Sequence, residues 1–236
     1  MCAICALTKT LFILRVTIGI ATIPERAEAL RDTLASLKGQ ADEVYVYLNG
    51  YDARPAWLPQ DVRALTGPDA GDAGKFAPAT MGIAGDVHVT CDDDLIYPPD
   101  FAQRLVDGVD KYGGAVSFHG RRQKAPTESY YRGPHEPLPC LGFVPYDQDC
   151  TVIGTGCMAF RPDEVPLRDA HFFAPNMADI LFSRRCAELG VRRTVLAHRP
   201  GYIVHSEKVD LGRTIFAAHV NSDTLQTRIF NETNWL

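Results

Sequence analysis

The strongest constraint on the fold is the order of elements at the start of the chain, where a β-type run, an amphipathic helical run and a second β-type run follow one another. Val16–Thr22 is apolar and rich in β-branched residues, and leucines then recur at helical spacing over residues 30–37. Glu43–Leu48 again has strand composition and ends at the turn pair Asn49 and Gly50. This β-α-β order predicts a parallel sheet.

The alternation of strands and helices continues beyond this unit. We expect a strand at Val87–Cys91, a helix opened by Pro98 and Pro99, and a strand over residues 115–118. Weaker patterns predict, in chain order, an irregular stretch over 51–74, a short helix over 75–81, strand-like segments over 151–160, 191–196 and 202–205, a helix over 177–189, and a final helix or arm containing Leu211, Ile215 and Phe216.

These elements predict one α/β domain of Rossmann-like type, with a mostly parallel central sheet and helices on both faces. Residues 1–15 form an N-terminal extension or an early strand, 16–118 the first half of the domain, and 119–236 the second half with a C-terminal arm. Residues 120–149 are long for a connection and rich in Pro and Tyr. This segment is either a functional loop or contains small elements of its own.

Composition narrows the class of protein. The chain has 236 residues, of which 46% are hydrophobic and 22% charged, which indicates one compact domain. A net charge of -5 excludes the broad basic surface typical of nonspecific nucleic-acid binding. Seven scattered cysteines favour a reducing, cytoplasmic location. The apolar start is interrupted at Lys9 and Arg15, so we expect no transmembrane segment and no signal peptide there.

Three consecutive carboxylates, Asp92, Asp93 and Asp94, follow the strand Val87–Cys91. The first and third can converge on one hard cation such as Mg²⁺ or Mn²⁺, while the second makes another contact. Ligands of open α/β sheets bind outside the carboxyl ends of the strands, which is where this triplet lies. The alternative is a solvated acidic turn, but apolar segments on both sides of the triplet disfavour it.

Four segments, VTIGIATIPERAEALRDTLASL, EVYVYLNG, GDAGKF and VHVTCDDDLIYPPDF, together resemble family-two-type glycosyltransferases of the GT-A fold. The likeness is good over the first half of the chain and loose over the second. It implies a nucleotide-diphosphate sugar donor bound mainly by residues 16–118, an acceptor hydroxyl, most simply on a saccharide, bound by residues 119–236, and a divalent cation. Asp92 and Asp94 would flank the metal or the donor ribose.

The resemblance also implies donor contacts for several residues, each with a structural alternative. Arg26 would pair with the diphosphate or stack on the base, unless it is a surface arginine, and Asn49 would bind the nucleotide, unless it only forms a turn. His119 would line the same cleft, with Arg121 and Arg122 beside it for anions, unless it is structural. The full set of predicted donor residues is Thr22, Arg26, Asn49, Asp72, Lys75, Asp92, Asp93, His119, Gly154, Thr155 and Gly156.

Asp179 lies where inverting members of the resembled family keep their catalytic base. A carboxylate there would take the acceptor's proton as its oxygen attacks the anomeric carbon. The alternative is an acid that stabilises a helix N-terminus, and Asp147 and Asp149 are the fallback bases. His205 is a candidate third metal ligand with Asp92 and Asp94, whereas His198 and His219 are weaker candidates.

Three rival functions remain at this stage. An aspartyl phosphotransferase needs a nucleophilic aspartate after the first strand, and Val16–Thr22 has none. A non-catalytic relative would bind a nucleotide sugar without transferring it. A glycosyltransferase acting on nucleic acid would use local arginine strips, for which the candidates are Arg121, Arg122, Arg184, Arg185, Arg192 and Arg193.

Overall fold

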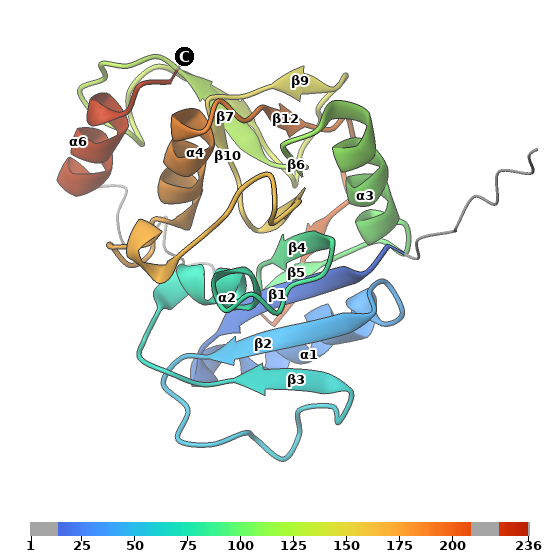
Figure 1. Cartoon of the computed structure of the whole chain (residues 1–236). Helices are drawn as coiled ribbons and strands as arrows, with labels where there is room; N and C mark the ends of the chain where they lie inside the picture. The colour runs from blue at the N-terminus through green and yellow to red at the C-terminus, as the bar shows by residue number, and fades with distance from the viewer. Residues whose placement is uncertain (1–13, 209–221, 236) are drawn as a thin grey trace, which may run out of the picture.

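The computed structural model describes residues 14–208 and 222–235, and these residues form one mixed α/β domain built on an eight-stranded sheet (Figure 1). From edge to edge the strands are β3 (Val62–Leu65), β2 (Glu43–Leu48), β1 (Val16–Thr22), β4 (Val87–Cys91), β11 (Cys157–Phe160), β6 (Ala115–Ser117), β12 (Arg193–Val195) and β9 (Gln148–Asp149). Strands β11 and β9 run against the other six, so the sheet is mostly parallel, as predicted.

Two smaller sheets and several helices surround the central sheet. The first small sheet has the order β10 (Val152–Ile153), β7 (Gly120–Gln123), β8 (His135–Leu138), and the second pairs β13 (Val204–His205) with β5 (Leu95–Ile96). The helices are α1 (Ala27–Leu37), α2 (Ala77–Thr80), α3 (Phe101–Tyr112), α4 (Ala178–Glu188) and α6 (Thr224–Glu232), with 3₁₀ turns η1 (Pro24–Arg26), η2 (Gly71–Phe76) and η3 (Asp169–His171).

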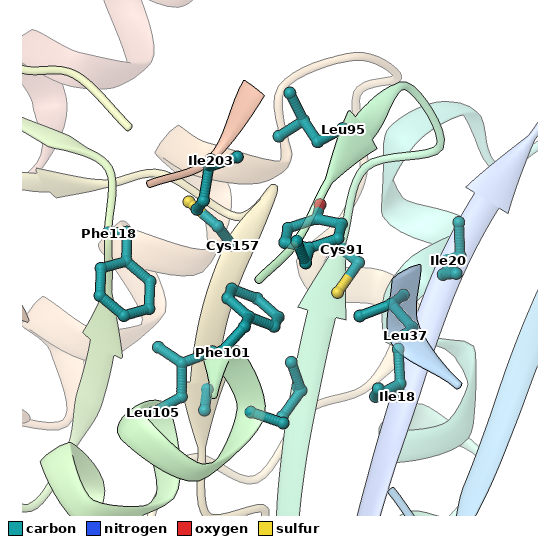
Figure 2. Close-up of a cluster of buried hydrophobic side chains, with 14 of the residues drawn as sticks. Ile18, Ile20, Leu37, Cys91, Leu95, Phe101, Leu105, Phe118, Cys157 and Ile203 are labelled. Carbon is teal, nitrogen blue, oxygen red and sulfur yellow. The ribbon is translucent and has the colours of Figure 1, made fainter. Parts of the chain in front are cut away.

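Side chains of the central strands alternate between two cores, one on each face of the sheet. In β11, Cys157 and Ala159 enter the core that contains Leu37 of α1 and Leu105 of α3. Figure 2 shows part of this core, with Phe101 between Cys157 and Leu105 and with Phe118 at the left. Met158 and Phe160 point to the opposite face, where they join side chains of α4 such as Phe182. Helices therefore cover both faces, which confirms the predicted fold class.

The predicted strands of the first half agree with the structure, and the differences lie in shorter elements. The segment 51–74 contains β3, and the helix predicted over 75–81 is η2 followed by α2. Residues 120–149 hold β7, β8 and β9, so this segment contains small elements of its own. The run 151–160 is two strands, β10 and β11, separated by Gly154, Thr155 and Gly156. These pieces are short and gain their pairing from distant strands, which sequence periodicity does not detect.

Two predictions at the chain ends are only partly covered. Residues 1–13 lie outside the described residues, and β1 starts at Val16, so the N-terminal extension stays a prediction. Leu211, Ile215 and Phe216 also lie outside them, whereas α6 supplies a final helix further on. Within 14–208 and 222–235, no helix is long and apolar enough to cross a bilayer.

The buried face of α3 provides a test of the core. Leu105 is fully buried between α3 and the sheet, and removing its side chain leaves a cavity that packing does not refill. We expect Leu105→Ala to lower the free energy of unfolding by about 2–5 kcal/mol, measured by urea denaturation. Leu225→Ala on α6, where the side chain is 39% exposed, is the matched control and should change stability by less than about 1 kcal/mol. Equal losses in the two variants would contradict the assignment of this core.

Candidate functional site

A cavity of about 760 Å³ lies at the carboxyl ends of β1 and β4. Its wall includes residues from both halves of the chain, from Ala21 at the end of β1 to His205 on β13. All of the predicted donor residues except Gly154 line this cavity, as do Asp179, Asp94 and His205. The topology therefore brings together side chains up to 184 positions apart in the sequence.

The acidic triplet is held by Arg26, which reaches it from η1. The Arg26 guanidinium nitrogen Nη1 donates to Asp93 Oδ1 at 2.8 Å and to Asp94 Oδ2 at 2.9 Å. Burial raises the pKa of Asp93, and Arg26 and, to a smaller extent, the Thr22 hydroxyl act against it. Arg26 is thus not a solvated surface arginine, because it forms ion pairs with two of the three carboxylates.

Lys75 neutralises the remaining carboxylate of the triplet. Only 3% of Lys75 is exposed, and its ammonium forms a short ion pair with Asp92. A buried lysine without such a partner would lose its proton, so this pair is a requirement of the local structure. The sequence also allows Lys75 to be a solvated surface lysine, and its burial shows that this alternative is wrong.

Buried hydrogen bonds and close packing fix the backbone of Lys75. The ring of His88 on β4 bonds Thr17 Oγ1 at 2.9 Å and the Lys75 carbonyl at 3.0 Å. Burial lowers the pKa of His88 to about 4, so the ring is neutral and adds no charge. Gly19 on β1 is required there, because a Cβ would collide with the same Lys75 carbonyl. The backbone under Lys75 is therefore fixed by three strand residues.

The carboxylates of the cavity differ in their proton affinity. Burial opposes the ionisation of Asp92, but the Lys75 ammonium outweighs it and lowers the pKa of Asp92. Burial, followed by the charge of Asp92, raises the pKa of Asp94 to about 6. Burial likewise raises the pKa of Asp72 to about 6, although Lys75 acts against it. At neutral pH, Asp92 is therefore the most firmly ionised of these three carboxylates.

The side chains of Asn49 and Asp72 bind backbone groups of neighbouring segments. Asn49 Nδ2 donates to the Gly71 carbonyl and its Oδ1 accepts from Ala70, both at 2.9 Å, so its amide is engaged by the backbone. Asp72 Oδ2 accepts from the Ala178 amide at 3.0 Å, at the start of α4. The other oxygen of Asp72 is buried and without a hydrogen bond in the described residues.

The run Gly154, Thr155 and Gly156 allows close packing against the cavity. A Cβ at Gly154 would collide with the ring of His119, and one at Gly156 would collide with the Asp92 carboxylate. Gly154 therefore accommodates His119 and does not line the cavity, whereas Gly156 leaves room beside Asp92. His119 lines the cavity, and its Nδ1 accepts from the Cys140 amide at 3.2 Å.

Asp179 is held in one orientation by Thr155. The Thr155 amide and hydroxyl both donate to Asp179 Oδ1, at 2.8 Å and 2.6 Å. In the described residues no hydrogen bond reaches Oδ2, and Asp179 lines the same cavity as the acidic triplet. The two fallback bases lie elsewhere, since Asp147 bonds Ala197 and Asp149 pairs with Arg192.

His205 lies beside the acidic triplet. Strand β13 pairs with β5 so that His205 faces Leu95, and the next amide, Ser206, donates to the Asp94 carbonyl at 2.8 Å. His205 Nδ1 is buried and has no hydrogen-bond partner among the described residues. His198, by contrast, has both ring nitrogens bonded to carbonyls, and His219 lies outside the described residues.

The donor set fits a hard divalent cation only in part. Carboxylate oxygens of Asp92 and Asp94 suit such an ion, as do the orphaned nitrogen of His205 and the space beside Gly156. Yet within residues 14–208 and 222–235 no three His, Cys, Asp or Glu side chains are grouped to hold a metal ion. Asp92, Asp94 and His205 are therefore not a preassembled three-ligand cage, and a bound ion would need ligands from a substrate.

One group of cavity residues was not among the predicted site residues. The cavity is also lined by Tyr130, Tyr131, Leu141 and Met177, and by Arg121, for which the sequence suggests only an anion contact. The Tyr-Tyr pair inside the long segment 120–149 is the one signal in the sequence. The sequence separation between this pair and Arg121 follows no pattern that would predict their contact.

Comparison with solved structures shows the same architecture. A GalNAc-T7 structure with UDP, GalNAc and Mn²⁺ has a TM-score of 0.54 at 12% identity, over 81% of this chain and 45% of that one. TarS 1-349 of S. aureus, in complex with UDP-GlcNAc, has a TM-score of 0.53 at 14% identity, over 79% of this chain and 57% of that one. The chain has a GT-A fold. It spans about half the length of these two GT-A structures.

Sequence comparison adds nothing to this result, because no family model and no curated protein matches the chain. At 12% and 14% identity, the likeness establishes the GT-A architecture and leaves the activity of this chain to its own residues. The fold implied by the resemblance in the sequence is therefore confirmed.

The raised pKa of Asp72 gives a test of the cavity's electrostatics. A carboxyl whose folded-state pKa is about 6 and whose unfolded pKa is about 3.9 loses stability as pH rises between those values. We expect Asp72→Asn, which keeps an acceptor for Ala178, to become more stable relative to wild type by up to about 3 kcal/mol between pH 4 and pH 7. Denaturant unfolding at the two pH values measures this. A constant difference between the proteins across that range would show that Asp72 is not buried.

Proposed function

We propose that this protein transfers a sugar from a nucleotide-diphosphate donor to an acceptor hydroxyl, with a divalent cation and with inversion at the anomeric carbon. The observation that carries the proposal is one cavity that is lined both by the acidic triplet and by Asp179. A donor held at the triplet would present its anomeric carbon between these two groups. UDP-sugars are the first donors to test, since GalNAc-T7 was crystallised with UDP and TarS with UDP-GlcNAc.

The charge of the cavity supports a requirement for the cation. Six carboxylates line it, from Asp69, Asp72, Asp92, Asp93, Asp94 and Asp179. Only three Arg or Lys side chains do so, namely Arg26, Lys75 and Arg121. The excess negative charge repels a diphosphate across short distances at low effective dielectric constant. A divalent ion at Asp92 and Asp94 would offset that repulsion and stabilise charge on the departing diphosphate.

Asp179 has the features of a general base. The two hydrogen bonds from Thr155 fix one oxygen, the second accepts no hydrogen bond in the described residues, and Asp179 lines the cavity. Such a carboxylate can accept the proton of an acceptor hydroxyl while that oxygen attacks the anomeric carbon. Thr155 therefore positions the base, which explains why the segment between β10 and β11 lies against the start of α4.

The surface arginines disfavour a nucleic-acid acceptor. Arg184 and Arg185 both pair with Glu188, Arg192 pairs with Asp149, and Arg122 lies near Glu136. Paired arginines on separate elements do not form the uncompensated basic strip that phosphate backbones require. A non-catalytic binding relative is separated from a transferase by the experiment that follows.

Two substitutions separate donor binding from transfer. Asp179→Asn should retain stabilisation by UDP-GlcNAc or UDP-GalNAc with Mn²⁺ in a thermal-shift assay and reduce sugar transfer by about 10²–10⁴-fold, because it removes the base alone. Asp94→Asn should lose both, because it removes a carboxylate from the cation site. Transfer is measured by chromatography of released UDP and of the glycosylated acceptor.

The matched control is Asp61→Asn, an exposed aspartate outside the cavity, which should keep both properties. Donor binding with no release of UDP by wild-type protein would favour the non-catalytic relative. Full transfer by Asp179→Asn would remove the assigned base.

A further inference from the structure

The cavity contains one arginine that its neighbours do not neutralise. Arg26 is paired with Asp93 and Asp94, and Lys75 is paired with Asp92. Arg121 lines the same cavity, but no Asp or Glu of the described residues lies within ion-pair distance of it. In a cavity with an excess of carboxylates, this unpaired guanidinium is the exception.

Arg121 is nevertheless held firmly by uncharged groups. Its Nη1 donates to the Tyr130 carbonyl at 2.9 Å, and its guanidinium lies 4.3 Å from the centre of the Tyr130 ring. The Tyr131 ring centre is 5.7 Å away. Burial raises the pKa of both tyrosines, to about 12 for Tyr131, so neither phenol supplies a negative charge. Stacking on an aromatic ring fixes the plane of the guanidinium and does not neutralise its positive charge.

The segment that contains Tyr130 and Tyr131, here called the tyrosine turn, is anchored by residues at the start of the C-terminal helix α6. The Tyr130 amide donates to Thr227 Oγ1 at 2.9 Å, and the Tyr131 amide donates to Asp223 Oδ2 at 2.8 Å. On the other side, Gln123 Nε2 donates to the Tyr130 carbonyl at 3.1 Å. Since α6 and β7 hold the turn from both sides, the orientation of Arg121 does not depend on a ligand.

Arg121 belongs to the half of the cavity that contains the proposed base. Strand β7 pairs with β10, with Arg121 opposite Val152, and β10 leads directly into Thr155, which holds Asp179. The Tyr130 ring is in the same apolar cluster as Ile180 of α4. Arg26 and Lys75, by contrast, are ion-paired with the acidic triplet. An anion bound by Arg121 would therefore lie beside an acceptor hydroxyl rather than at the donor diphosphate.

We propose that Arg121 binds an anionic group, a carboxylate or a phosphate, carried by the acceptor next to the hydroxyl that is glycosylated. This inference rests on the proposed function, because it names the acceptor class of the same site. A planar, preoriented guanidinium matches both oxyanions through paired hydrogen bonds. A neutral saccharide would leave this charge without a counterion in a partly buried position, which is unfavourable. Arg121 thus determines which acceptors bind.

Binding of small anionic sugars tests this directly. Glucuronate, glucose 6-phosphate and glucose are titrated by calorimetry into the protein, with and without UDP and Mn²⁺. We expect at least one of the two anionic sugars to bind about tenfold or more tightly than glucose, and Arg121→Gln to abolish that preference. The sugar that binds more tightly distinguishes a carboxylate from a phosphate. Arg121→Lys should retain part of the preference.

The matched control is Arg122→Gln, the next residue on β7, which does not line the cavity and lies 3.5 Å from Glu136. It should keep the full preference for anionic sugars. Thermal melting of each variant shows that it is folded. Equal binding of glucose and both anionic sugars by wild-type protein, or an unchanged preference in Arg121→Gln, overturns the proposal.

UDP affinity is measured in the same series. If Arg121→Gln weakens UDP binding, Arg121 contacts the donor and the assignment to the acceptor is wrong. If wild-type protein binds an anionic sugar through Arg121 but no nucleotide sugar, the anion site stands and the proposed function fails. The two conclusions are therefore separable.

Discussion

The site depends on the neutralisation of three adjacent carboxylates by two cations from other parts of the fold. Asp92, Asp93 and Asp94 follow β4, and three like charges at such spacing are unfavourable unless cations lie beside them. Lys75 pairs with the first and Arg26 with the other two. Neither cation is close to the triplet in sequence. The three carboxylates are therefore neutralised only when η1, η2 and the end of β4 lie together in the fold.

This requirement explains several features of the strands around the triplet. Gly19 leaves space for the Lys75 carbonyl, and the neutral ring of His88 bonds it. Gly156 leaves space for the Asp92 carboxylate on the other side. These residues carry no charge themselves. They fix the positions of the charged side chains around the cavity. The cavity is thus a preorganised electrostatic site on a rigid sheet, with the proposed base held independently by Thr155.

The parallel half of the fold was predictable from the sequence because its strands are apolar runs separated by a helix with clear periodicity. The triplet's position was predictable for the same reason, since β4 is a continuous buried strand. Short elements such as β3 and β7 were not, because they are strands only through pairing with distant neighbours. The same holds for the ion pair of Arg26 and for the stacking of Arg121 on Tyr130, which are long-range contacts without a spacing rule. Gly154 was placed at the cavity by analogy, whereas its actual neighbour is His119.

The central claim is that the acidic triplet forms a cation-dependent diphosphate site, and calorimetric titration of UDP in Mn²⁺ and in EDTA tests it most directly. Because the cavity carries more carboxylates than Arg and Lys side chains, we expect UDP to bind at least about tenfold more tightly with Mn²⁺ than with EDTA. Equal UDP affinity in the two buffers would contradict the account, since Arg26 and Lys75 alone would then be sufficient for the diphosphate.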